Sequence, residues 1–371
     1  MHVIVTVNSA WNILNFRRPM VEALISAGHE VSVLAPRDDS CAALQALGCR
    51  YLPLDMNVKG LNPIDDLRLM ARYRRIFRRE RPDVVLSYTI KNNLFGALAA
   101  RMTGTPFLPN VTGLGTAFLS GGALQRLAEG LYRAAFSRLP VVFFQNSDDR
   151  DLFVARSLVR PDQARLLPGS GIDLNRFAPA DWPRAGAQPA FLMIARLLRD
   201  KGVLEYVEAA RSIRAEYPQV KFRLLGATGS ENRTAIDAPT VQSWVDEGVI
   251  DYLGTTDDVR PEIAQAHCVV LPSYREGAPR TLIEAAAMAR PVIATDVPGC
   301  RAVLDADLSG YLCAPRDGAS LAEAMRRFLA LSPQAQQAMG QAGRDKMVRE
   351  FDQAIVVSRY HDAIRELTGG R

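Results

Sequence analysis

The chain has 371 residues, of which 48% are hydrophobic and 23% charged, with a net charge of +5 and five cysteines. This length exceeds one ordinary core and suits two domains, and the composition excludes a disordered chain. No signal sequence follows Met1, and no stretch approaches the roughly 18 uncharged apolar residues that cross a bilayer, so we expect neither export nor a membrane span.

Positive charge is concentrated in the first half of the chain. Residues 1–178 contain 22 Lys/Arg and 15 Asp/Glu, whereas residues 179–371 contain 23 and 25. This asymmetry predicts that the first half meets an anionic partner. The cysteines lack metal-binding spacing, so we expect buried, reduced thiols and an intracellular location.

Apolar runs with high β-propensity alternate with helical segments, which favours parallel sheets built from βα units. In the first half, strands are predicted at residues 3–7, 30–34, 50–53, 84–87, 107–111 and 141–145, and helices at 19–27 and 65–80. After a linker near 170–188, strands are predicted at 191–194, 220–225, 250–253, 268–272, 292–295 and 310–313. Helices are predicted at 202–215, 279–289, 321–331, 333–349 and 353–368. The expected architecture is two successive α/β sheets.

The predicted helix at 65–80 is rich in arginine, with seven arginines between Asp66 and Arg81. Apolar residues recur at helical spacing, which predicts one apolar face and a basic remainder; they are Leu67, Met70, Tyr73, Ile76 and Phe77. Such a helix suits an anionic membrane surface, and its apolar stripe equally suits packing on the first sheet. The apolar loop 113–124 is open to two interpretations, a contact with a polyprenyl chain or simple burial.

The segment 273–285 carries the sharpest chemical pattern. It follows an apolar strand and opens an alanine-rich helix, so Glu276 and Gly277 lie at a strand end. A helix start at 278–281, with Pro279 in its first turn, offers backbone N–H groups and a positive dipole end to a phosphate. Glu284 lies among apolar helix residues and requires a polar partner, either a ribose diol or a local cap or ion pair.

Two cations follow the strand at 191–194. Arg196 and Lys201 are five residues apart at a strand end, and they either straddle a diphosphate or are two solvated surface charges. In the first interpretation they neutralise the charge that grows on a departing nucleoside diphosphate.

Taken together, these segments resemble the retaining glycosyltransferases of family 4. The resemblance rests on Glu276 and Glu284 with seven residues between them, on Arg196 upstream of Lys201-Gly202, and on the segment 167–173 followed by Phe177. It implies the α/β fold called GT-B, two facing Rossmann-like domains with a C-terminal helix that crosses back to the first domain. Residues 1–170 with helix 353–371 are then the acceptor-binding, membrane-facing domain, and 171–352 the nucleotide-sugar-binding domain.

The resemblance also implies roles for individual residues. Glu276, Arg196 and Lys201 are the expected catalytic residues, with the two cations on the donor diphosphate and Glu276 near the sugar 3-hydroxyl. Glu284 is expected to bind the ribose hydroxyls. The remaining donor-binding positions implied are Gly226, Gly254, Gly277, Ala278, Arg280 and Thr281.

The segments 88–93, 110–118 and 298–301 are similar to a narrower subgroup, which adds GalNAc or galactose to undecaprenyl-diphosphate-linked sugars in bacterial O-antigens, capsules and N-glycan precursors. This similarity implies a UDP-sugar donor, with GalNAc expected, and a lipid-linked saccharide acceptor. The expected place is the cytoplasmic, anionic face of the membrane, with no nucleic acid as partner.

Two departures from the family pattern concern the acceptor side. The first βα loop, with Asn8 and Ser9, lacks the glycine pair of many members, and Thr112 stands where many have histidine. The change suits a mechanism in which the leaving phosphate accepts the proton of the acceptor, while Lys91 and main-chain groups such as Gly113 position the reactants. The four histidines lack metal spacing and there is no Asp-x-Asp group, so we expect transfer without metal or other cofactor.

Two competing functions remain at this point. A sugar-nucleotide 2-epimerase has the same fold, but its set of acidic and histidine residues is not recognisable here. A non-enzymatic nucleic-acid-binding protein using the arginine helix would leave the second half without a purpose.

Overall fold

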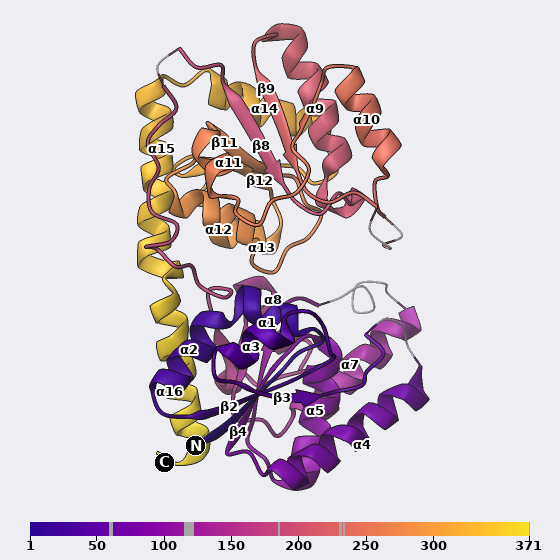
Figure 1. Cartoon of the computed structure of the whole chain (residues 1–371). Coiled ribbons are helices and arrows are strands. Elements are labelled where there is room, and N and C mark those ends of the chain that lie inside the picture. Colours follow the sequence, from indigo (N-terminus) through magenta and orange to yellow (C-terminus); the bar gives the residue numbers. More distant parts are fainter. Residues whose placement is uncertain (59–61, 115–121, 185, 230–231, 233, 371) are drawn as a thin grey trace. The chain divides into compact units, whose positions relative to one another are not determined.

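The computed structural model describes residues 1–58, 62–114, 122–184, 186–229, 232 and 234–370 (Figure 1). The chain divides into two compact units, one of residues 1–171 and 353–371 and the other of residues 172–352. Each unit has a parallel sheet of its own with helices on both faces. All five cysteines are buried and free. None of the described helices is both long and apolar enough to cross a membrane.

The sheet of the first unit has the order β3-β2-β1-β4-β5-β6-β7, with every neighbouring pair parallel. Its strands are β1 (His2–Thr6), β2 (Glu30–Ala35), β3 (Arg50–Pro53), β4 (Val84–Tyr88), β5 (Phe107–Val111), β6 (Val142–Phe144) and β7 (Ala164–Leu166). The strand order reverses between β1 and β4. Ligands of open α/β sheets bind outside the carboxyl ends of the strands at such a reversal.

Two groups of helices cover the faces of this sheet. One core contains side chains of α1 (Ala10–Phe16), α2 (Arg18–Ser26), α3 (Cys41–Ala46) and α16 (Gln353–Thr368). The other contains side chains of α4 (Pro63–Glu80), α5 (Ile90–Thr103), α7 (Gly122–Phe136) and α8 (Ser147–Ala155). The expected return of the last helix to the first half of the chain is confirmed, because Val356, Tyr360 and Ile364 of α16 are buried in the first core.

Sequence periodicity placed the apolar face of α4 imperfectly. Leu69, Tyr73 and Phe77 form the buried stripe, whereas Leu67, predicted to lie on it, is 59% exposed. Positions separated by four residues share one face of a helix. Other apolar residues flank this face on both sides, so the sequence alone did not show which face is buried. The helix also begins earlier than predicted, because the Asn62 side chain accepts a hydrogen bond from the Ile64 amide at 3.0 Å.

The second sheet has the order β10-β9-β8-β11-β12-β13 and is likewise parallel. Its strands are β8 (Ala190–Ile194), β9 (Lys221–Leu225), β10 (Asp251–Tyr252), β11 (Cys268–Leu271), β12 (Val292–Thr295) and β13 (Gly310–Cys313). The helices of this unit are α9 (Val203–Glu216), α10 (Ala238–Asp246), α11 (Arg260–Gln265), α12 (Arg280–Ala287), α13 (Pro298–Val303), α14 (Gly318–Leu329) and α15 (Pro333–Lys346). A 3-10 turn, η2 (Arg199–Lys201), precedes α9, and a π-helical turn, η3 (Met347–Phe351), follows α15.

Three predicted helices in this unit end earlier than expected, and one of them, predicted at 321–331, ends at Leu329. The helix predicted at 279–289 ends at Ala287, because Ala289 adopts a left-handed backbone with φ of 57°. Pro279 is the N-cap, with ψ of 106°, rather than the first helical residue. The helix predicted at 333–349 gives way to η3 after Lys346.

The predicted linker near 170–188 is largely fastened to the second unit. Arg344 donates hydrogen bonds to the carbonyls of Phe177 at 2.8 Å and Ala287 at 2.7 Å. Arg290, which is 1% exposed, donates to the carbonyl of Ala180 at 3.1 Å. Backbone carbonyls thus accept hydrogen bonds from the guanidinium groups of both arginines, which fastens the linker to this unit.

Gly202 brings η2 against the end of β11. Its φ is 76°, and a Cβ atom built there would lie 2.1 Å from the carbonyl oxygen of Pro272. Only glycine combines that backbone conformation with such an approach. Lys201 therefore depends on Gly202 for its position beside the loop after β11.

We predict that Gly202→Ala destabilises the protein far more than Gly248→Ala. Gly248 has a similar φ of 73° but no atom within 4 Å of a built Cβ. The left-handed backbone costs about 1–2 kcal/mol in both variants, and the collision adds about 1–3 kcal/mol only at Gly202. Calorimetric unfolding of both variants measures the difference. Equal losses of thermal stability would contradict this account of Gly202.

Candidate functional site

The candidate site lies at the carboxyl edge of the second sheet. Two connections meet there, one running from β8 through η2 to α9 and the other from β11 to α12. The strands β8 and β11 are neighbours in the sheet, with Phe191 paired to Cys268 and Leu192 to Val269. Residues far apart in sequence are therefore brought to one edge, as the parallel arrangement predicts.

An ion pair joins these two connections. Lys201 Nζ donates a hydrogen bond to Glu276 Oε1 at 2.5 Å. The hydroxyl of Ser273 donates to the same oxygen at 2.6 Å. The side chains of Lys201 and Glu276 are 24% and 12% exposed, so a ligand can reach them while bulk water screens them only in part. Two of the three residues predicted to be catalytic are thus in direct contact.

The backbone of the Glu276 loop is held from the far side by α13 and β12. A Cβ atom at Gly299 would lie 2.4 Å from the carbonyl oxygen of Glu276. The hydroxyl of Thr295 donates a hydrogen bond to the carbonyl of Ser273. The loop therefore has little freedom, which keeps the carboxylate of Glu276 in one place.

Glu284 has a local partner, which was one of the two interpretations left open by the sequence. Arg280 Nε donates to Glu284 Oε1 at 2.6 Å, within the first turns of α12. Burial raises the pKa of Glu284 above its ordinary value, and the guanidinium of Arg280 opposes that rise. Glu284 as a whole residue is 8% exposed. A largely buried acid with one cationic partner remains a candidate for accepting further hydrogen bonds.

The other predicted donor-side residues line the same edge. Arg196 is exposed two residues after the end of β8, and its side chain makes no hydrogen bond or ion pair within the described residues. The hydroxyl of Thr281 donates to the carbonyl of Ile194 at 3.1 Å, which ties α12 to β8. Gly226 follows β9, and its amide donates to the carbonyl of Gly254 at 2.8 Å. Gly277 and Ala278 are partly buried in the loop before α12.

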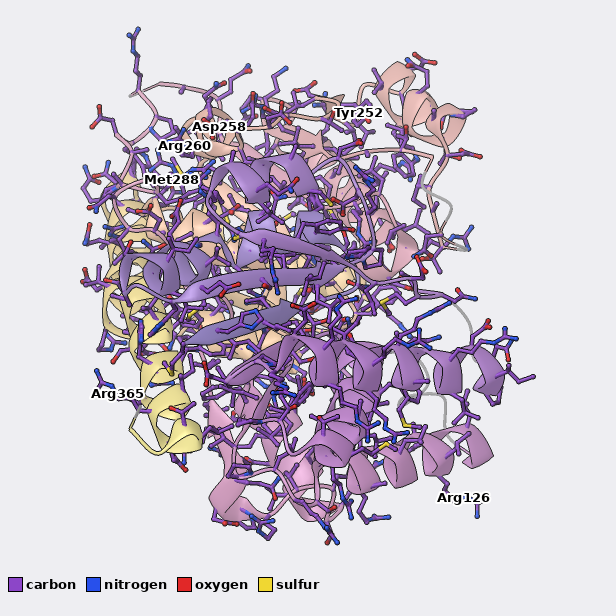
Figure 2. The ribbon with its side chains drawn as sticks, turned by 60° about the horizontal axis from the view of Figure 1, so that its bottom comes forward. Arg126, Tyr252, Asp258, Arg260, Met288 and Arg365 are labelled. Carbon is purple, nitrogen blue, oxygen red and sulfur yellow. The ribbon has the colours of Figure 1, made fainter. Side chains whose placement is uncertain are left out.

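Sequence reasoning missed a charged pair beside Glu284. Arg260 donates to Asp258 at 2.6 Å, and Figure 2 labels both residues. This bonding lowers the pKa of Asp258 to about 2. Asp258 and Arg176 both act electrostatically on Glu284. Only the short spacing of opposite charges in Asp-Val-Arg indicated this pair, and such spacing is common on surfaces.

Sequence reasoning also missed a buried carboxylate that holds the Glu276 loop. The hydroxyl of Tyr274 donates to Glu205 Oε1 at 2.6 Å. The Tyr274 amide donates to the carbonyl of Asp200 at 3.0 Å. Tyr274 thus links α9, η2 and the loop after β11.

The predicted acceptor-side residues all belong to the first unit. The hydroxyl of Ser9 donates to Asp38 at 2.8 Å, and Lys91 pairs with Asp66 at 2.9 Å. Asn8 lies in the connection after β1, which is shorter than predicted because α1 begins at Ala10. Thr112 and Gly113 follow β5 and are partly buried, whereas most of the loop 113–124 lies outside the described residues.

The described residues contain no cluster of three or more histidine, cysteine, aspartate or glutamate side chains able to hold a metal ion. His267 instead accepts a hydrogen bond from the Ala190 amide at 3.2 Å through Nδ1. Burial lowers the pKa of His267, as expected for an imidazole in a core rather than a ligand shell.

Two family models match the chain in succession. Residues 15–169 match a glycosyl transferase 4-like domain, and residues 188–330 match the glycosyl transferases group 1 model. The two Rossmann-like sheets, the charged strand-end site and these matches define a glycosyltransferase of the GT-B fold. The chain belongs to the group 1, or 4-like, glycosyltransferases and is a hexosyltransferase.

Curated relatives span nearly the same length. N,N'-diacetylbacillosaminyl-diphospho-undecaprenol alpha-1,3-N-acetylgalactosaminyltransferase of Campylobacter jejuni is 26% identical over 365 residues, covering 94% of each chain. UDP-Gal:alpha-D-GlcNAc-diphosphoundecaprenol alpha-1,3-galactosyltransferase of Escherichia coli is 26% identical over 326 residues, covering 83% of this chain and 81% of that one.

Solved structures support the fold. A glycosyltransferase of Rickettsia africae superimposes with a TM-score of 0.79 at 16% identity, covering 100% of this chain and 99% of that one. Anabaena HepE in complex with UDP gives a TM-score of 0.78 at 15% identity, covering 99% and 100%. At these identities the comparison shows the GT-B fold alone.

We predict that Glu284→Gln stabilises the protein more at pH 8 than at pH 4.5. The folded-state pKa of Glu284 lies above its unfolded value, so its contribution to stability is present at low pH and is lost as pH rises through the folded pKa. The neutral glutamine removes that loss. Thermal unfolding of both proteins at the two pH values measures the effect, and a stability difference that does not change with pH would contradict it.

Proposed function

We propose that the protein transfers a hexose or N-acetylhexosamine, with GalNAc expected, from a UDP-sugar to a lipid-diphosphate-linked saccharide. The proposed reaction retains the anomeric configuration and requires no metal. The contact between Lys201 and Glu276 carries the proposal, since it places a cation and a hydrogen-bond acceptor at one strand end. A diphosphate needs the first group and a sugar hydroxyl needs the second.

In the proposed donor complex, Lys201 and the exposed Arg196 bind the diphosphate. Lys201 then shares its charge between the phosphate and Glu276, whose carboxylate accepts from the 3-hydroxyl of the sugar. The N-terminus of α12, preceded by Gly277 and Ala278, contributes backbone N–H groups and the positive end of its dipole. Gly226 and Gly254 flank the base, at the ends of β9 and β10.

The ribose hydroxyls require the carboxylate of Glu284. One of its oxygens accepts from Arg280. The other is directed in the proposal to the ribose diol, while the guanidinium of Arg280 opposes the rise in the pKa of Glu284 that burial causes. Thr281, bonded to the carbonyl of Ile194, keeps α12 fixed against β8 during this exchange.

The proposed chemical step proceeds on one face of the sugar. The acceptor oxygen forms a bond to the anomeric carbon as the bond from that carbon to the β-phosphate oxygen breaks. The acceptor proton passes to the departing phosphate, and the two cations stabilise the negative charge left on the diphosphate. Thr112 replaces a histidine of many relatives, so an imidazole is not assigned a role. Asn8, Ser9, Lys91 and Gly113 are proposed to position the acceptor.

The proposed acceptor follows from two relatives that cover most of the chain. The printed names of both describe transfer to sugars linked to undecaprenol through a diphosphate. The basic first half of the chain is consistent with an acceptor whose linkage carries negative charge.

We predict that the purified protein transfers sugar from a UDP-sugar to GlcNAc linked by a diphosphate to a lipid, and that Lys201→Ala lowers kcat about 100- to 1,000-fold. Arg199→Ala removes an exposed cation from the same turn and should leave kcat within about twofold. Mass spectrometry of the lipid product against a panel of UDP-sugars gives the donor. Release of free or epimerised sugar without lipid product would contradict the proposal and indicate an epimerase.

Two further measurements test retention of the anomeric configuration and independence from metal. Retention requires an α-linked product from an α-linked donor, which the anomeric coupling constant in proton NMR reports. Transfer without metal requires full activity after exhaustive treatment with EDTA. A β-linked product or a restoration of activity by added Mg²⁺ would each overturn one part of the proposal.

Association with an anionic membrane is proposed through the outer surface of α4. This surface lies opposite the buried stripe of Leu69, Tyr73 and Phe77 and is apolar at the start of the helix and basic toward its end. Its members are Ile64, Leu67, Arg68, Ala71, Arg75 and Arg78, all exposed. Ile64 is 60% and Leu67 59% exposed, which provides apolar contact beside the cations.

We predict that the protein pellets with anionic liposomes at low salt and is released at high salt. Arg75→Gln with Arg78→Gln should weaken binding by about 2 kcal/mol, or about 30-fold in partition. Arg199→Gln with Lys221→Gln removes the same charge from exposed positions of the second unit and serves as the control. Recovery in the supernatant at every salt concentration, or equal loss in both double variants, would remove α4 from this role.

A further inference from the structure

Arg17 of the first unit is a buried cation at the carboxyl edge of the sheet. It joins α1 to α2, and its residue is 6% exposed. The guanidinium carbon lies 4.3 Å from the ring centroid of Tyr88, the last residue of β4. Nη1 donates a hydrogen bond to the hydroxyl of Ser170 at 2.7 Å. The side chain is therefore held in place on two sides.

This guanidinium has no anionic partner. No carboxylate among the described residues forms an ion pair with Arg17, and its Nε is buried without a hydrogen-bond acceptor. Its neighbour Arg18, by contrast, is 53% exposed and pairs with Glu22 at 2.8 Å. An unpaired charge in a protein interior is strongly unfavourable, and proteins retain one where a ligand supplies the opposite charge.

Two buried amide oxygens without donors belong to residues at the same edge of this sheet. Asn110, at the end of β5, is paired in register with Tyr88, so it lies one strand away from the residue under Arg17. Asn110 Nδ2 donates to the hydroxyl of Tyr360 at 2.9 Å, which leaves Oδ1 without a donor. Asn93 donates to the carbonyl of Asn110 at 2.8 Å, and its own Oδ1 also has none.

A cation and two acceptor atoms at one edge of a sheet define the chemistry of a ligand. An inorganic anion would satisfy Arg17 but would add no donor for the two amide oxygens. Sugar hydroxyls donate hydrogen bonds to amide oxygens, and a phosphoryl group accepts from a guanidinium. A sugar that carries a phosphoryl group offers both.

We propose that Arg17 binds the phosphoryl group next to the acceptor sugar, and that Asn110 and Asn93 accept from hydroxyls of that sugar. This assignment rests on the proposed function, which supplies a diphosphate-linked saccharide as acceptor. Arg17 becomes the residue by which the first unit distinguishes an acceptor with a charged linkage from the same saccharide without one.

The test compares two acceptor analogues in the full-length protein with saturating UDP-sugar. One is GlcNAc joined to a short alkyl chain through a diphosphate, and the other is the neutral alkyl glycoside. Arg17→Met should raise KM for the diphosphate analogue by about tenfold or more, since a charge-assisted contact is lost. The KM for the neutral analogue and for the UDP-sugar should stay within about twofold, as should every KM of the control Arg18→Met.

Thermal stability without ligand separates binding from a structural role. Arg17→Met should leave the melting temperature unchanged or raise it, because it removes an unpaired buried charge. Arg17→Lys should keep part of the preference for the diphosphate analogue. A lowered melting temperature with equal loss of affinity for both analogues would show that Arg17 is structural, and an unchanged preference in Arg17→Met would also overturn the proposal.

A final measurement is independent of transfer. With saturating UDP present, inorganic pyrophosphate should raise the melting temperature of the wild-type protein and of Arg18→Met but not of Arg17→Met. If neither acceptor analogue is used by the wild-type protein while this Arg17-dependent stabilisation persists, the proposed function fails and the anion site stands. If the stabilisation does not depend on Arg17, the site itself is wrong.

Discussion

The contact between Lys201 and Glu276 is the constraint on which the second unit is organised. The two residues are 75 positions apart in the sequence, and their contact requires the β8 and β11 connections to approach closely. Gly202 permits the approach on one side, and Gly299 permits α13 to pack against the Glu276 loop on the other. Tyr274 fastens the same loop to α9 and η2 through Glu205 and Asp200. Backbone packing and buried hydrogen bonds therefore position the charged pair. The electrostatic attraction between Lys201 and Glu276 contributes less, because water partly reaches both side chains.

Three acids at this edge each have a cation beside them. Glu276 pairs with Lys201, Glu284 with Arg280, and Asp258 with Arg260. Such pairing gives each partly buried carboxylate an opposite charge when no ligand is bound. A diphosphate that binds Lys201 competes with Glu276, and a sugar hydroxyl that binds Glu276 compensates for the competition. In the proposed donor complex, binding is therefore an exchange of hydrogen-bond partners: the phosphate replaces Glu276 at Lys201, and the sugar hydroxyl replaces Lys201 at Glu276.

Much of this arrangement follows from the sequence, because the strand ends of a parallel sheet collect residues in a predictable way. Alternating apolar segments predicted both sheets, and the position of Glu276 after an apolar strand predicted its place at the edge. Glu205 was not predictable, since a glutamate in the first turn of a helix is ordinary and only tertiary packing buries it. The local pairing of Glu284 depends on a rotamer of Arg280, which pattern reasoning does not determine. The predicted buried face of α4 was partly wrong for a similar reason, because apolar residues occur on more than one face of this helix.

The residues of the first unit show a different way of preparing for a ligand. Lys91 and Ser9 already have partners in Asp66 and Asp38, so they resemble the compensated pairs of the second unit. Arg17 lies above the ring of Tyr88, which attracts its positive charge but brings no countercharge. A ligand at a compensated pair must disturb an existing contact, whereas a ligand at Arg17 supplies a missing one. For a given anion, the free energy gained on binding is therefore larger at the uncompensated site. The cost is that the ligand-free protein carries a buried charge without a countercharge from its own residues.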